Sequence, residues 1–201
     1  MICPYEQVFP ARYPLMSDIR LIWDAADYCC DLAFVHVVVA PDSLPPFTVA
    51  AEVIEQDTAR VLDEDMILLE PDESLGHLVR EMVTEPMPAP GSVLASGAHP
   101  LQIQAIIHDL DKEPSWCEVG IREAWRGIVS CCEEHAIDTL ALPLLGTRLR
   151  SMDRRQSVRL LRELILGSRP ACLQRIWLRC PLGAQQQVLE LLQGESGPAA
   201  C

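Results

Sequence analysis

Four consecutive residues at the end of a short apolar run have the chemistry of a phosphate site. They are Leu145, Gly146, Thr147 and Arg148. Glycine lets the backbone turn tightly and direct its N–H groups at a ligand, and a guanidinium binds phosphate through paired hydrogen bonds. We therefore predict that these four residues contact a ligand phosphate. A tight connection between a strand and a helix would use the same residues, so a structural turn is the alternative.

Arginines are concentrated directly after this turn. They form the one concentrated positive segment of a chain whose formal net charge is −13, and they are Arg148, Arg150, Arg154, Arg155, Arg159 and Arg162. The first four precede or begin a predicted helix, whose N-terminus favours anions and opposes positive side chains. Their partner is therefore predicted to be negative, either a bound phosphate or the protein's own acids and solvent.

A histidine and three acids could carry acid–base or metal chemistry, but their surroundings favour other roles. His108, followed by Asp109 and Asp111, could suggest a metal site or a general base. Glu52, Glu55 and Asp57 have no histidine, cysteine or serine placed beside them, so we predict that they form a solvated face. No catalytic residue is assigned from these patterns.

The nine cysteines show no CxxC spacing. The adjacent pairs Cys29-Cys30 and Cys131-Cys132 lie in apolar segments, which favours small core residues kept reduced. Cys131 and His135 are one helical turn apart but lack a second pair of ligands, so no metal site is predicted.

The elements that position the predicted phosphate site begin with a central strand. The run from Asp138 to Leu145 is apolar, too short for a helix and flanked by helical patterns, which indicates a strand buried on both faces of an α/β sheet. Pro143 cannot donate to a ladder, so pairing is predicted to end there. The carboxyl edge of the sheet is then the place for a site.

Helices are predicted on both sides of this strand. The earlier helix begins with a capping box of Ser115 and Glu118, and the later one with Asp153 and Gln156. The earlier helix has one apolar face, made of Ile121, Ala124, Trp125, Ile128 and Cys132. A further helix is predicted from 73 to 83 and a last one from 183 to 193.

Further strands follow from β-branched or apolar runs bounded by turn residues. The predicted strands are 19–23, 34–40, 47–54, 92–98, 105–109 and 175–180. Residues 58–69 could form a helix, or residues 66–69 a strand of their own, and the sequence leaves this open.

Length and charge set the class of protein. A chain of 201 residues fits one domain, predicted at 19–193, with an irregular N-terminal arm at 1–18 and a flexible tail at 194–201. Its net charge of −13 disfavours general nucleic-acid binding. No run is long and apolar enough to span a membrane and no signal-peptide pattern begins the chain, so a cytoplasmic location without membrane contact is expected.

Several segments together resemble the second half of a macrodomain, the fold that binds ADP-ribose. They are residues 90–97, 105–108, 142–147 and 175–178, with a predicted helix on each side of the third, and the resemblance covers roughly 86–193. It implies a three-layer α/β/α fold with a mixed, mostly parallel central sheet. It also implies ADP-ribose or a similar nucleotide as the ligand, with no separate cofactor. The histidine of this family that matches His108 lies at a strand end and is not catalytic, so the resemblance implies a hydrogen-bonded structural role for His108.

The first half of the family pattern fits in two ways. An acidic residue after an early strand contacts adenine in this family, and the next strand ends in asparagine. If residues 35–39 form the early strand, Asp42 is the acidic residue; if 49–54 form it, Asp57 is. The first placement is preferred, because the second leaves too little chain for the next helix. The chain has no asparagine and no glycine before Gly76.

The predicted function is therefore a weak, non-catalytic binding module for ADP-ribose or a related nucleotide diphosphate. Its predicted ligand-binding residues are Asp42, Leu145, Gly146, Thr147 and Arg148. The alternatives are a macrodomain-like scaffold that acts through a protein partner without a nucleotide, and an ADP-ribosyl hydrolase with atypical residues.

Overall fold

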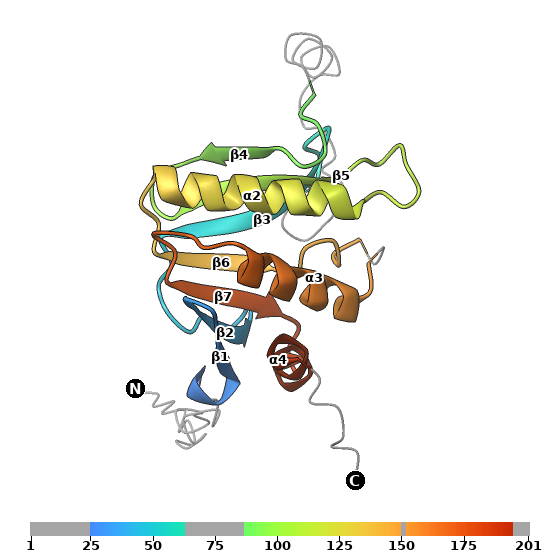
Figure 1. Cartoon of the computed structure of the whole chain (residues 1–201). Helices are drawn as coiled ribbons and strands as arrows, with labels where there is room; N and C mark the ends of the chain where they lie inside the picture. The colour runs from blue at the N-terminus through green and yellow to red at the C-terminus, as the bar shows by residue number, and fades with distance from the viewer. Residues whose placement is uncertain (1–24, 63–86, 150–151, 195–201) are drawn as a thin grey trace, which may run out of the picture.

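A computed structural model describes residues 25–62, 87–149 and 152–194. In these ranges the chain forms one seven-stranded sheet in the order β1-β2-β7-β6-β3-β5-β4 (Figure 1). The strands are β1 (Cys29–Leu32), β2 (Val35–Pro41), β3 (Ala51–Asp57), β4 (Val93–Ser96), β5 (Leu101–His108), β6 (Thr139–Pro143) and β7 (Arg175–Cys180). The inner strands β2, β7, β6, β3 and β5 are parallel, and the edge strands β1 and β4 are antiparallel to their neighbours. The predicted mixed, mostly parallel sheet is confirmed.

The predicted central strand is β6. It lies between β7 and β3, with Leu140 opposite Ile176 on one side and opposite Ala51 on the other. All five of its residues are buried. Pro143 is its last residue, as expected for a residue without an N–H to donate.

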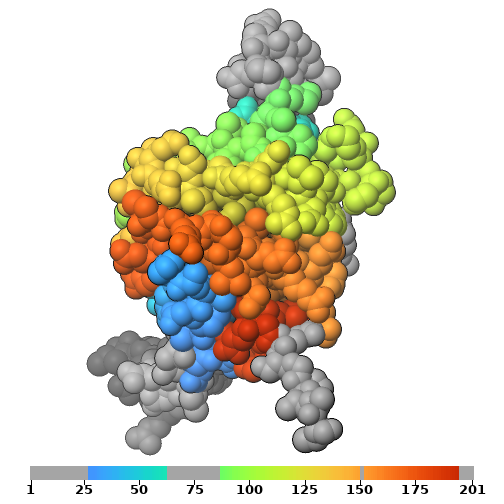
Figure 2. Space-filling model, viewed as in Figure 1, coloured from blue at the N-terminus to red at the C-terminus, as the bar shows by residue number. Residues whose placement is uncertain are grey.

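Within the described ranges, three α-helices cover one face of the sheet. They are α2 (Glu118–Glu134), α3 (Arg154–Gly167) and α4 (Gln185–Gln193), preceded in the chain by a 3-10 turn, η1 (Ala25–Tyr28). The predicted apolar face of α2 is buried in the core, and Figure 2 shows the helices as a continuous layer on this side of the molecule. The indole Nε1 of Trp125 donates to Ser168 Oγ at 3.2 Å, which links α2 to the end of α3.

The start of α2 differs from the prediction. Its N-cap is Cys117, whose Sγ accepts from the Gly120 N–H at 3.3 Å, so no capping box forms at Ser115. The Ser115 hydroxyl lies 3.1 Å from His108 Nδ1 instead, because the chain has not yet reached the helix at that point. At the start of α3 the predicted cap is present, with Asp153 Oδ2 accepting from the Arg155 N–H at 3.1 Å.

The strand predicted at 47–54 is displaced toward the C-terminus and runs as β3 from Ala51 to Asp57. Phe47 and Val49 precede it and pack against a small second cluster that includes Trp177. The predictions at 1–18, 19–23, 66–69 and 73–83, and all but the first residue of the tail at 194–201, lie outside the described residues. No helix in the described ranges is long and apolar enough to cross a membrane.

Removal of side-chain volume from the central strand should destabilise the fold. Leu142 is fully buried in β6, so Leu142→Ala should lower the free energy of unfolding by about 2 to 5 kcal/mol through lost burial and a residual cavity. The matched control is Leu182→Ala, because Leu182 is 75% exposed and its loss should change stability by about 0.5 kcal/mol or less. Urea unfolding of both variants checks this, and equal effects would contradict the assignment of β6 to the core.

Candidate functional site

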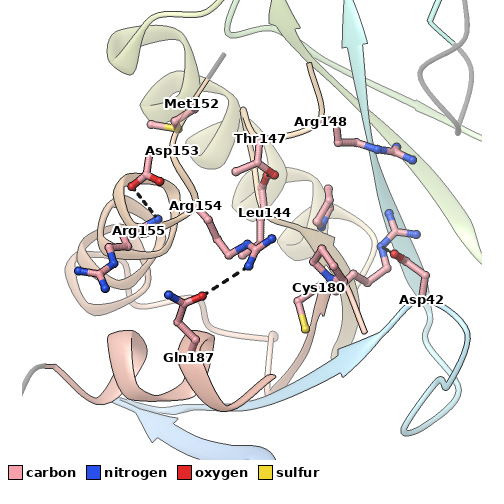
Figure 3. Close-up of a pocket in the computed structure, with 13 residues that line it drawn as sticks. Asp42, Leu144, Thr147, Arg148, Met152, Asp153, Arg154, Arg155, Cys180 and Gln187 are labelled. Atoms are coloured by element: carbon pink, nitrogen blue, oxygen red, sulfur yellow. Dashed lines mark hydrogen bonds and ion pairs between the residues drawn. The ribbon is translucent and has the colours of Figure 1, made fainter. Parts of the chain in front are cut away.

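One pocket of about 920 Å³ lies at the carboxyl edge of the sheet (Figure 3). It is formed by the ends of β6 and β7, the residue that follows β2, the start of α3 and one residue of α4. Its lining residues are Asp42, Pro143, Leu144, Thr147, Arg148, Met152, Asp153, Arg154, Arg155, Arg179, Cys180, Pro181 and Gln187. The four arginines exceed the two aspartates, so the pocket is positive within an acidic chain.

The arginines reach the pocket from different elements. Arg154 extends into the space between α3 and α4, where its Nη1 is 3.5 Å from Gln187 Oε1 (Figure 3). Arg148 comes from the loop after β6, and its side chain lies on the opposite side of the pocket from that of Arg155 (Figure 3). Four arginines thus line one cavity beside the N-terminus of a 14-residue helix.

Arg179 at the end of β7 is the most firmly held of these arginines. Its side chain is 14% exposed, its Nη2 donates to the Val53 carbonyl at 2.7 Å, and its Nη1 pairs with Glu52. Its Nε lies 3.5 Å from Asp42 Oδ1. Asp42 itself is 71% exposed, so this contact leaves most of its carboxylate open to the pocket.

The loop after β6 is closed by its own hydrogen bonds. Thr147 donates to the Leu144 carbonyl from both its N–H, at 3.1 Å, and its Oγ1, at 2.7 Å. The Leu145 carbonyl accepts from Ser157 Oγ at 2.8 Å. Leu145 and Gly146 are buried behind the wall of the pocket, whereas Thr147 and Arg148 line it.

Gly146 occupies a position that only glycine fits. Its φ of +82° is a left-handed conformation, and a Cβ atom there would lie 3.0 Å from Met152 Sδ and 3.2 Å from Ile121 Cδ1. Its N–H donates to Glu55 Oε1 at 3.0 Å, whereas the sequence predicted that this group faces a ligand. The glycine therefore serves the packing of the loop against the core.

Glu55 belongs to a buried polar network at the ends of β3 and β5. Its Oε2 lies 3.2 Å from His108 Nε2, and both side chains are fully buried. The prediction of a solvated face for Glu55 was therefore wrong. His108 also approaches Ser115 through Nδ1, which confirms the interpretation of a hydrogen-bonded structural histidine.

Asp57 is also fully buried, against the prediction of a solvated face. Its carboxylate accepts from the N–H groups of Ala59 at 2.7 Å, Val61 at 3.0 Å and Leu62 at 3.2 Å, so it folds the chain that leaves β3. Asp57 does not line the pocket, whereas Asp42 does.

The sequence carried a signal for this burial. Alternate residues of a strand point to the same face, so Glu55 and Asp57 share a face with Ala51 and Val53, which are core residues. Glu52 points the other way and pairs with Arg179. Arg179 was missed as a pocket residue, although its place at the end of the last strand puts it at the carboxyl edge.

The thiols near the core are held in the neutral form. Burial is the main cause that raises the pKa of Cys180, which lines the pocket, to about 11, and that of Cys132 to about 12. A thiol at that pKa is a poor nucleophile at neutral pH. No group of three or more potential metal ligands occurs within the described ranges.

Comparisons with known proteins match the fold and no more. No protein-family model and no curated protein matches the chain. Solved macrodomains match it with TM-scores of 0.55 for ganglioside induced differentiation associated protein 2, 0.55 for the Trypanosoma brucei protein in complex with ADP, and 0.56 for an Oceanobacillus iheyensis variant with ADPR. The respective identities are 12%, 13% and 11%.

The matches extend over most of each protein. They cover 78%, 80% and 82% of this chain in that order, and 83%, 69% and 94% of the three solved chains. The α/β class predicted from the sequence is confirmed, and so is the resemblance that its segments suggested. The chain has the macrodomain fold.

Proposed function

We propose that the chain is a binding module for ADP-ribose or a related nucleotide diphosphate. The phosphates of the ligand lie in the pocket at the carboxyl edge of the sheet, where Arg148 and Arg154 reach them. The module binds weakly and does not hydrolyse its ligand.

The charge of the pocket carries this proposal. The chain has a net charge of −13, yet arginines outnumber aspartates by four to two in the pocket lining. Like charges close together are unfavourable unless an anion offsets them, and a phosphate accepts hydrogen bonds from several guanidiniums at once. The adjacent N-terminus of α3 adds partial positive charge to the same space.

The ligands of similar proteins support a diphosphate. The Trypanosoma brucei structure holds ADP and the Oceanobacillus iheyensis structure holds ADPR. In the present chain Asp42 lies on the same pocket as the arginines and is largely exposed. Its carboxylate is suited to accept a hydrogen bond from the amino group of a base, which would place the nucleoside near the end of β2 and the phosphates near α3.

We expect weak binding because two backbone N–H groups of the loop after β6 are not available to a ligand. The N–H groups of Gly146 and Thr147 already have partners within the protein. The arginine side chains must therefore bind the phosphates, and a long side chain loses rotamer entropy when it is ordered by a ligand.

The absence of catalysis follows from the state of the nearby acids and thiol. Asp42 pairs with Arg179, and Asp153 caps α3. Glu55 is sealed beneath the loop, and burial keeps the Cys180 thiol protonated, with a pKa of about 11. A hydrolase needs a base or nucleophile beside the bond that breaks, whereas in the proposed pose Asp42 faces the nucleobase and Asp153 is engaged as the cap of α3.

Calorimetry with ADP-ribose should give a dissociation constant between about 1 µM and 1 mM, a binding free energy of about −8 to −4 kcal/mol. ADP serves as a second ligand in the same experiment, because it shares the diphosphate. Sub-micromolar binding would contradict the weakness of the site. No heat with either ligand at millimolar concentration would contradict binding and favour a scaffold that acts through protein contacts.

Arg148→Ala should weaken ADP-ribose binding by about 10- to 100-fold, or about 1.5 to 3 kcal/mol, because a charged hydrogen bond to phosphate is lost. The free energy of unfolding should change by about 1 kcal/mol or less, since Arg148 is half-buried at the surface of the loop. The matched control is Arg126→Ala, which removes the same charge from the exposed face of α2. Equal affinity of the parent and the Arg148 variant would place the phosphates elsewhere.

Incubation with an ADP-ribosylated protein should release no ADP-ribose above the spontaneous rate, because in the proposed pose none of the described pocket residues acts as a base or nucleophile beside the scissile bond. Chromatography of the released nucleotide measures this. Release that disappears in Asp42→Ala would show a hydrolase that uses this acid.

A further inference from the structure

A single buried carboxylate joins three segments that are far apart in the chain. Glu55 near the end of β3 is fully buried, and both of its oxygens have partners. Oε1 accepts from the N–H of Gly146, 91 residues later, at 3.0 Å. Oε2 lies 3.2 Å from Nε2 of His108, at the end of β5. No residue in this network lines the pocket, but Gly146 is the residue directly before Thr147 and Arg148, which do.

Such a carboxylate is stable only while its partners stay in place. Removing a carboxylate from water is costly unless it is paired and fully hydrogen-bonded. The reverse also holds, because the buried Gly146 N–H would lack its acceptor if Glu55 were absent. The contact therefore fixes the position of Gly146 relative to the end of β3.

His108 fixes the second oxygen and extends the network. It is fully buried, and its Nδ1 lies 3.1 Å from Ser115 Oγ, just before α2. With the hydrogen on Nε2, His108 donates to Glu55 and accepts from the serine hydroxyl. His108 on β5 thus fixes the side chain of Glu55, and Glu55 in turn fixes the loop after β6.

The position of Gly146 determines where the pocket residues lie. Leu145 is fixed on one side by Ser157, and Thr147 closes the turn back to Leu144 on the other. The left-handed backbone of Gly146 allows this turn, and the Glu55 contact selects it among the conformations that glycine permits. A displacement of this residue would move Thr147 and Arg148 together.

We propose that Glu55 is a positioning residue for the ligand pocket. It acts through the Gly146 N–H to hold the loop from Leu144 to Arg148 in its binding conformation, with His108 as its support. The inference deepens the proposed function and rests on it for the effect on affinity. The effect on the loop itself does not need a ligand.

The first test compares two buried acids of the same strand. Glu55→Ala should weaken binding of ADP, measured by calorimetry on the full chain, at least tenfold. Asp57→Ala is the matched control, because Asp57 is equally buried but bonds to residues 59–62, away from the loop after β6. It should leave the affinity within threefold. Glu55→Gln keeps an oxygen for Gly146 and should restore affinity to within threefold of the parent.

The second test follows the loop without ligand. Amide hydrogen exchange of Gly146 should be slow in the parent, the Asp57→Ala variant and the Glu55→Gln variant, and at least tenfold faster in Glu55→Ala. Equal loss of ADP affinity in both alanine variants would overturn the proposal. Fast exchange of Gly146 in the parent would also overturn it, even if Glu55→Ala does not fold.

The two proposals fail in different ways. If the parent protein binds no ADP while Gly146 exchange depends on Glu55, the proposed function is wrong and the positioning of the loop by Glu55 stands. If the parent binds ADP and Glu55→Ala binds it equally well, the proposed function stands and the role of Glu55 is wrong.

Discussion

The hydrogen bond from the Gly146 N–H to the buried carboxylate of Glu55 links the sheet to the candidate site. In a parallel sheet the carboxyl ends of the strands lie at one edge. The loops that follow the strands there are held in position by the side chains packed under them. Here that side chain is Glu55, near the end of β3. It contacts Gly146 in the loop after β6 and His108 at the end of β5, the two strands beside β3. Because a buried carboxylate is costly without its partners, these contacts constrain the loop after β6.

This arrangement changes how the site can recognise an anion. Backbone N–H groups are preorganised donors, but those of Gly146 and Thr147 are bonded within the protein. Arginine side chains line the pocket in their place, and of these arginines only Arg179 has several partners among the described residues: Glu52, Val53 and Asp42. Arg148 and Arg154 are less constrained, so an anion at this site would have to order them on binding. The fold thus provides positive charge with little preorganisation.

The sequence was sufficient to predict those helices and strands that are marked by a pattern of neighbouring residues. The run that became β6 and the apolar stripe of α2 follow from periodicity and length, and the position of Pro143 follows from its missing N–H. The site was predicted only in part. Asp42, singled out through the family resemblance, and Thr147 and Arg148, singled out through the turn after the central strand, line the pocket, but Arg179 depends on a pairing with Glu52, 127 residues away. Contacts between such distant residues leave no periodic pattern.

Glu55 shows why the prediction of a solvated face for the acids of β3 was wrong. An acidic residue usually lies in water, so a strand with three acids was interpreted as solvated. The alternation of side chains along β3 nevertheless places Glu55 in the row of Ala51 and Val53, on the core face. A charge in that row requires a buried partner, and the chain supplies His108 on the adjacent strand β5, together with a glycine N–H. The conflict between residue type and strand face thus marked a buried polar network at the strand ends, directly beneath the loop that supplies Thr147 and Arg148 to the pocket.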